Sequence, residues 1–270
     1  MGSDKREIRK RFAEAKKEYE ELGGRAAFQS GDWLWRLIQK SFKNYWERAN
    51  AEYFQEKYRT SDEKTIAKKL IGVSAKNASV LGAIVGAAVS VDEIVALSTA
   101  GEGGVGLPAN IAIALAAVAA EAILLVRIQM HLVVNIGKIY GAPLDPDDPE
   151  DILTILAFAL GGSVAEAAGR EEMRLGARFA GNTVRKVIQK DVLAALQRVA
   201  ARAGVKILQR SIVKYAMPTA SIGIGLGWNY LSTKAIGKTA IRHFEKRIQS
   251  FPGNRANDVI PPNDPATNSP

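Results

Sequence analysis

The chain alternates between mixed-charge and apolar segments rich in helix-favouring residues, with glycine and proline at the joints between them. Residues 4–22 predict a mixed-charge helix that ends at Gly23-Gly24. Ser30-Gly31-Asp32 predicts the start of a helix that runs from about residue 33 into the fifties, and Thr60-Ser61-Asp62-Glu63 predicts the start of another. Strand patterns are nearly absent, so the expected fold class is all-α.

The middle of the chain is built mainly from small and aliphatic residues. Residues 75–100 are small and apolar, and a glycine-rich break follows at 101–106. Pro108 suits the first turn of a long apolar helix that ends near Gly141-Ala142-Pro143. These two arms predict an Ala/Gly-rich helical hairpin over 78–136, at the centre of a multi-helix bundle.

The later segments complete the expected organisation. An acidic, proline-containing connection at 145–151 leads into a helix at about 150–160, and further helices fill 170–215 and 219–250. The last residues combine proline with Asn, Asp and Ser, which predicts a disordered tail. The expected parts are charged, Trp-rich N-terminal helices at 1–60, a helical domain at 61–250 and the tail at 251–270.

The longest apolar window, residues 107–126, approaches the ~20 residues that a membrane-spanning helix needs. Glu121 lies inside this window, and a central carboxylate costs about 2.5–3.5 kcal/mol on insertion. Much of the window is alanine, which gains little on transfer into lipid. We therefore favour burial in a helical bundle and keep insertion of the hairpin as the alternative.

Several polar groups would then lie inside the bundle. Arg127 and His131 share one helix face because they are four residues apart, and Asp92 and Glu93 in the preceding arm are their expected partners. Together with Glu121, these residues form either an internal ion-pair network that fixes helix register or a groove for a ligand or a lipid head group.

A stretch in the N-terminal part carries three of the four tryptophans. A helix that lies in a membrane interface needs rings at head-group depth and cations on lipid phosphates. An amphipathic helix that buries its aromatic face in the core has the same spacing, and the sequence leaves both interpretations open. The candidate lipid-binding residues of this stretch are Trp33, Trp35, Arg36, Lys40, Phe42, Lys43 and Trp46.

The formal net charge of +9 is unevenly distributed. Residues 1–77 carry six more basic than acidic side chains, 78–169 carry eight more acidic ones, and 170–250 carry twelve more basic ones. Cations spaced four apart in the last segment form either a solvated helix face or a surface that attracts anionic lipid, at about 1 kcal/mol per residue. The candidates are Arg198, Arg202, Lys206, Arg210, Lys214, Lys234, Lys238 and Arg242.

Familiar catalytic and nucleic-acid-binding motifs are absent from the sequence. With no cysteine and two histidines, His131 and His243, we predict no disulfide, no thiolate nucleophile and no metal site. The glycines at 101–106 and 223–227 fit neither a phosphate loop nor a dinucleotide fingerprint, and hydrolase, metalloprotease and kinase signatures are missing. Helix-turn-helix, zinc-finger and RNP patterns are missing too, which argues against nucleic acid. We expect neither a cofactor nor enzymatic activity.

The C-terminal part contains Met217-Pro218, a glycine-rich apolar helix up to Asn229-Tyr230, and a basic Gly-x-x-Ala-x-x-x-Phe helix that ends at Phe244. In the centre, Leu107-Pro108 opens the apolar helix, which ends at Tyr140-Gly141 before Asp147-Asp148-Pro149. In the order and spacing of these motifs, residues 66–250 resemble the EcsC protein family. The resemblance implies an α-helical, membrane-associated bacterial protein and supplies no catalytic residues.

The leading hypothesis is a cytoplasmic bacterial protein that is peripheral at the inner membrane. Its expected partner is an anionic lipid surface, a lipid or other apolar ligand between the Gly-rich helices, or a membrane protein. The charged start of the chain lacks the apolar core of a signal peptide. The first alternative is an integral or conditionally inserting protein that resembles a pore or channel. The second is a lipid-modifying enzyme with an unrecognised site around Asp92, Glu93, Glu121 and His131.

Overall fold

The computed structural model describes residues 5–49, 51–59, 61–88, 109–159, 185–216 and 221–250, and within these ranges every regular element is a helix. This confirms the predicted all-α, multi-helix fold class. In chain order the helices are α1 (Lys5–Glu21), α2 (Gly24–Ser30), α3 (Asp32–Arg48), α4 (Ala51–Lys57), α5 (Glu63–Ala88), α7 (Ala109–Ile139), α8 (Pro149–Ala159), α11 (Arg185–Ala216) and α12 (Ser221–Ser250).

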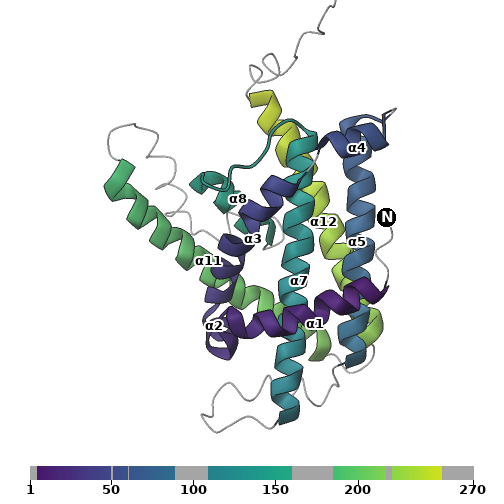
Figure 1. Cartoon of the computed structure of the whole chain (residues 1–270), viewed down its shortest axis with the longest axis vertical. Helices are drawn as coiled ribbons and strands as arrows, with labels where there is room; N and C mark the ends of the chain where they lie inside the picture. Colours follow the sequence, from purple (N-terminus) through teal and green to yellow (C-terminus); the bar gives the residue numbers. More distant parts are fainter. Residues whose placement is uncertain are drawn as a thin grey trace, which may run out of the picture.

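Helix α7 stands at the centre of the bundle (Figure 1). Helix α12 lies along α5, and both pack against α7. Helix α5 runs antiparallel to α7 and α12, so the first residues of α7 and α12 lie at the same end of the molecule as the last residues of α5 (Figure 1). Helix α1 crosses α7, while α11 packs against α2, α3, α7, α8 and α12.

Local chemistry sets several helix ends where the sequence predicts them. The Asp62 carboxylate accepts the backbone N–H of Thr65 at 2.7 Å, which caps the start of α5. Helix α1 stops before Gly23, whose φ is +106°. Helix α7 stops before Gly141, whose φ of +64° turns the chain so that the N–H groups of Gly141 and Ala142 bond back to carbonyls of the last turn.

Other boundaries differ from the prediction. The helix expected to run into the fifties ends at Arg48, and the short helices α2 and α4 were not predicted. The backbone at Ala49 is extended, with φ −68° and ψ 121°, and its carbonyl accepts a hydrogen bond from Lys138 Nζ at 2.8 Å. A side chain from the far end of α7 thus holds this break. Residues 89–108, 160–184 and the predicted tail at 251–270 lie outside the described residues.

Two described segments, Glu63–Ala87 and Ile113–Ile139, are long and apolar enough to cross a membrane. This composition is compatible with membrane association. In the fold, 78% of the apolar window in α7 is buried, against 39% of the window in α5. Helix α7 is therefore a core helix, covered by α1, α3, α5, α8, α11 and α12.

Candidate functional site

The tryptophan-rich stretch forms α3, and most of its aromatic face is buried. Trp33 is fully buried and stacks on Phe28 with ring centroids 4.7 Å apart, while Trp35 and Phe42 are also buried. Of the two interpretations left open by the sequence, core packing is the one observed. The expectation that Trp33, Trp35 and Phe42 contact lipid is corrected, because these rings are buried in the core, where α2, α7 and α11 pack against α3.

The other candidates of α3 contact neighbouring helices. Lys40 forms ion pairs with Glu18 at 3.2 Å and Glu21 at 2.8 Å, and the hydrogen bond that Lys40 donates to Glu21 raises the pKa of Lys40. Arg36 donates to the carbonyl of Leu22 at 3.2 Å, and so binds the C-terminal end of α1. The half-buried Trp46 ring lies 5.0 Å from Lys138 Nζ, whereas Lys43 is exposed. Arg36 and Lys40 therefore join α3 to α1.

Arg127 pairs with a residue that the sequence did not indicate. Its guanidinium donates to the nearly buried Glu18 carboxylate at 2.7 Å, because α1 crosses α7 at this point. The expected partners Asp92 and Glu93 lie outside the described residues, so that pairing stays a prediction. His131 follows one turn later, and its ring packs against Tyr45 with centroids 5.4 Å apart.

Glu121 belongs to a different contact. It is fully buried, and its carboxylate accepts a hydrogen bond from the Asn229 amide at 2.7 Å. The same amide nitrogen donates to the carbonyl of Ala78 at 3.1 Å. This link joins α5, α7 and α12. Glu121 therefore links three helices through Asn229, in a contact separate from the Arg127–Glu18 pair. The choice between the two predicted roles, an ion-pair network or a ligand groove, stays a prediction.

The cationic candidates on α11 and α12 are mostly exposed. The exposed ones are Arg198, Arg202, Lys206, Arg210, Lys238 and Arg242. Lys234 is half-buried, with its ammonium 5.1 Å from the centroid of the Tyr230 ring. The side chain of Lys214 lies outside the described residues, although its backbone belongs to α11. The predicted attraction of these cations to anionic lipid stays a prediction.

One surface was not recognised from the sequence. Three helix segments contain no Asp, Glu, Lys, Arg or His: 77–88 of α5, 109–120 of α7 and 221–233 of α12. We call these three segments together the apolar end. They meet at one end of the bundle (Figure 1). Among the described residues, three of the four exposed large hydrophobic side chains lie here: Ile113, Trp228 and Leu231 are 61%, 48% and 66% exposed.

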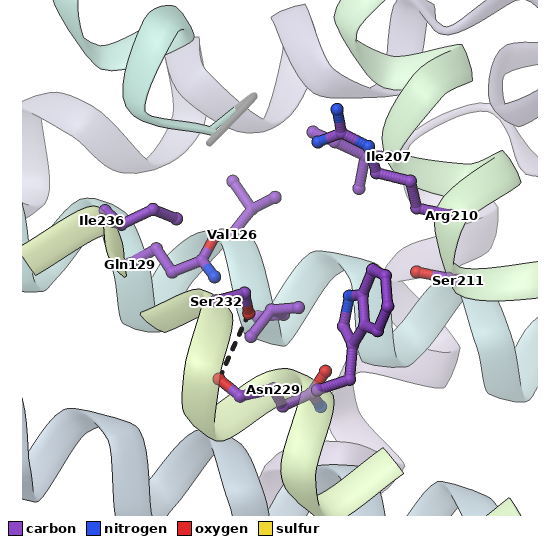
Figure 2. A pocket seen from close by; sticks show the side chains of 10 residues that line it. Val126, Gln129, Ile207, Arg210, Ser211, Asn229, Ser232 and Ile236 are labelled. Atoms are coloured by element: carbon purple, nitrogen blue, oxygen red, sulfur yellow. Dashed lines mark hydrogen bonds between the residues drawn. The ribbon is translucent and has the colours of Figure 1, made fainter. Parts of the chain in front are cut away.

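A cavity of about 70 Å³ lies between α7, α11 and α12, beside the apolar end. Its walls combine aliphatic groups such as Val126 and Ile207 with the polar side chains of Gln129, Arg210 and Ser211 (Figure 2). Trp228 also lines the cavity, which joins it to the exposed apolar surface. In the described part of the chain, no three Asp, Glu or His side chains lie close enough together to hold a metal ion.

At the other end of α12, a second buried polar contact is structural. Asp151 at the start of α8 is buried, accepts both guanidinium nitrogens of Arg247, and accepts the backbone N–H of Asp145 at 2.7 Å. His243 packs one turn before Arg247, with its ring edge-on to Phe158 and Phe244. This contact holds α8 and its acidic connection on α12.

The fold is expected to lose stability in mild acid through His243. Burial, and then the Arg247 charge, lower the pKa of His243 below its usual 6.5, although Asp151 opposes this. A folded-state pKa below the unfolded one means that the neutral ring's contribution is complete above pH 6.5 and is lost as the pH falls towards the folded value, at no more than about 1.4 kcal/mol per pH unit.

Urea unfolding of the wild type and of His243→Gln between pH 7.5 and 5.5 measures this effect. The variant should lose less free energy of unfolding than the wild type over that interval. His131 is retained in both proteins, so its own titration cancels. Equal losses in the two proteins would show that the His243 ring titrates normally.

The structure thus brings together two features that bear on function, the exposed side chains of the apolar end and the mixed cavity beside them. Of the predicted site residues, Lys40 and Arg127 meet at the Glu18 carboxylate, whereas the α3 aromatics and the Glu121 link lie in other contacts. No family model, curated protein or solved structure matches the chain.

Proposed function

We propose that this is a non-enzymatic, membrane-associated helical protein that docks its apolar end on an anionic lipid surface. The observation that carries the proposal is the concentration of exposed Ile113, Trp228 and Leu231 on helix segments that have no charged residue. Apolar groups gathered in one place on a surface mark a site of contact with a partner or a membrane.

The physical fit to lipid has two parts. A tryptophan at head-group depth with aliphatic groups beside it suits a membrane interface, and burying a side chain such as leucine yields about 1.5–3 kcal/mol. The formal charge of +9 and the exposed cations of α11 and α12 supply attraction to anionic head groups. Arg210 lines the same cavity as Trp228, so at least one of these cations lies at the edge of the apolar end.

The resemblance to the EcsC family supports a bacterial setting. Within the proposal, the protein is cytoplasmic and peripheral at the inner membrane. Its cationic surface suits that membrane because the cytoplasmic leaflet is negatively charged. A membrane protein partner on the same surface is the outcome that remains if purified lipid is not bound.

Insertion of α5 and α7 is a second candidate. The apolar window of α5 is only 39% buried in the bundle, so part of this helix has little protein to cover it. Extraction of bacterial membranes with alkaline carbonate separates the two modes of attachment. A docked protein is released into the supernatant, whereas an inserted hairpin stays in the pellet.

Replacing the exposed apolar groups is expected to abolish docking without unfolding the protein. The double variant Trp228→Ser, Leu231→Ser removes two side chains that are 48% and 66% exposed. We expect vesicle binding to weaken more than tenfold, because each group contributes about 1 kcal/mol or more at the interface. Co-sedimentation with anionic and neutral vesicles, at low and high salt, measures the effect.

The matched control is Tyr53→Ser, which removes an exposed ring, 43% accessible, on α4 at the opposite end of the bundle (Figure 1). This control should bind vesicles as the wild type does. Equal binding by the double variant and the control would exclude the apolar end as the docking surface. Absence of binding by the wild type to any vesicle would overturn direct lipid attachment.

A further inference from the structure

The cavity between α7, α11 and α12 has the chemistry of a site for an anion. Among the described residues that line it, Arg210 is the cation and none is acidic. Gln129 and Ser211 add an amide and a hydroxyl from facing sides of the cavity (Figure 2). The Gln129 amide uses one N–H on Thr233 at 3.4 Å and has a second N–H to offer. The indole N–H of Trp228 is a further donor.

The size of the cavity limits what it can hold. At about 70 Å³ it is several times smaller than the roughly 300–1,000 Å³ of sites that enclose whole organic ligands. It has room for a group of a few atoms with oxygens on several sides. A guanidinium next to neutral N–H and O–H donors is the combination that binds phosphate, because two parallel N–H groups match two phosphate oxygens.

We propose that this cavity binds the phosphate group of an anionic phospholipid, with Arg210 as its main ligand and Ser211, Gln129 and Trp228 as further donors. The inference rests on the proposed membrane docking and adds the lipid class that is recognised. Trp228 lines the cavity and is exposed, as is Leu231 three residues later in α12, so the acyl chains stay in the bilayer while the head group enters between α11 and α12. The apolar end and the cavity thereby bind two parts of one lipid.

The first test compares vesicles of equal surface charge whose anionic component is either a phosphate monoester or a carboxylate, on the same phosphatidylcholine background. Phosphatidylcholine vesicles carry either phosphatidic acid, which has a phosphate monoester, or oleate, which has a carboxylate. We expect the wild type to bind the phosphatidic acid vesicles about tenfold more tightly. Arg210→Gln should remove this preference. The control Lys206→Gln replaces an exposed cation one turn earlier on α11, outside the cavity, and should weaken binding to both vesicles equally and keep the preference.

The outcome for the phosphate site is separable from the outcome for docking. Wild-type binding to both vesicles with equal affinity would overturn the phosphate site and leave the docking proposal standing. Equal loss of the preference in Arg210→Gln and Lys206→Gln would also overturn it, because the preference would then come from surface charge in general.

The second test asks whether the phosphate is recognised apart from a lipid. Inorganic phosphate is titrated into the protein at constant ionic strength while tryptophan fluorescence is recorded, with Trp228→Phe as the blank. A saturable change that is absent from Trp228→Phe and Arg210→Gln supports a site that takes free phosphate. No change, together with a preference for phosphatidic acid vesicles, assigns the site to the lipid head group. No change and no preference would reject the site.

Discussion

Gly204→Ala is expected to lower the free energy of unfolding by about 3 kcal/mol, although it adds a single methyl group. A Cβ at position 204 would lie 2.3 Å from the carbonyl oxygen of Gly31 and 2.9 Å from its Cα. Here α11 crosses the turn between α2 and α3 with backbone against backbone. Because no flexible side chain stands in the contact, relief requires that α11 move away from the buried α3 aromatics that it covers.

Gly31, on the other side of this contact, should tolerate a side chain even less than Gly204. A Cβ at Gly31 would lie 1.8 Å from the carbonyl oxygen of Ala201, and Gly31 has a φ of +83°, which L side chains rarely adopt. We expect Gly31→Ala to cost more than Gly204→Ala and to combine with it less than additively, since both substitutions separate the same pair of backbones.

Gly72→Ala is the matched control for these substitutions. Gly72 lies within α5, and a Cβ there would meet nothing within 4 Å. Alanine should therefore stabilise the helix by about 1 kcal/mol, through propensity alone. Chemical denaturation of the three single variants measures the difference. A Gly204→Ala protein as stable as Gly72→Ala would show that α11 does not contact the α2–α3 turn as closely as described.

The sequence predicts helix boundaries where the determining chemistry is local. The Asp62 carboxylate caps α5 by accepting the backbone N–H of Thr65, only three residues later, and Gly141 ends α7 by its own backbone conformation. Both boundaries can therefore be predicted from the local sequence. The break at Ala49 depends on Lys138, which lies 89 residues further along the chain. Such a boundary is a consequence of tertiary packing, and neither glycine nor proline marks it.

The candidate site was less predictable for the same physical reason. Helical spacing identifies an apolar face, as it does for Trp33 and Trp35, but it is the same whether protein or lipid covers that face. The pairing of Arg127 with Glu18 depends on how α1 crosses α7, which no local pattern encodes. The sequence did offer a signal for the apolar end, because 221–233 has no charged residue and contains a tryptophan, but which of its side chains are exposed depends on how α12 packs against α5 and α7.

Glu121→Ala is expected to cost about 3 kcal/mol of folding free energy. The substitution removes the acceptor of a 2.7 Å hydrogen bond from the buried Asn229 amide and leaves a cavity in a fully buried position. Glu121→Gln keeps an oxygen in the place of the acceptor and nearly the same volume. We expect its free energy of unfolding to stay within about 1 kcal/mol of the wild type. Equal losses in the two variants would mean that the negative charge, and not the hydrogen bond, holds the three helices together.

Comparison of Glu121→Gln with the wild type also distinguishes docking from insertion. A carboxylate inside an inserted α7 would cost about 2.5–3.5 kcal/mol, whereas a glutamine costs less. If the hairpin inserts, Glu121→Gln should raise the fraction of protein that resists carbonate extraction. If the apolar end only docks, Glu121 remains inside the bundle in both states, and the substitution should leave that fraction and the affinity for vesicles unchanged. Glu121 is covered by α5 and α12 in the folded protein, so it contributes to membrane attachment only when those helices separate.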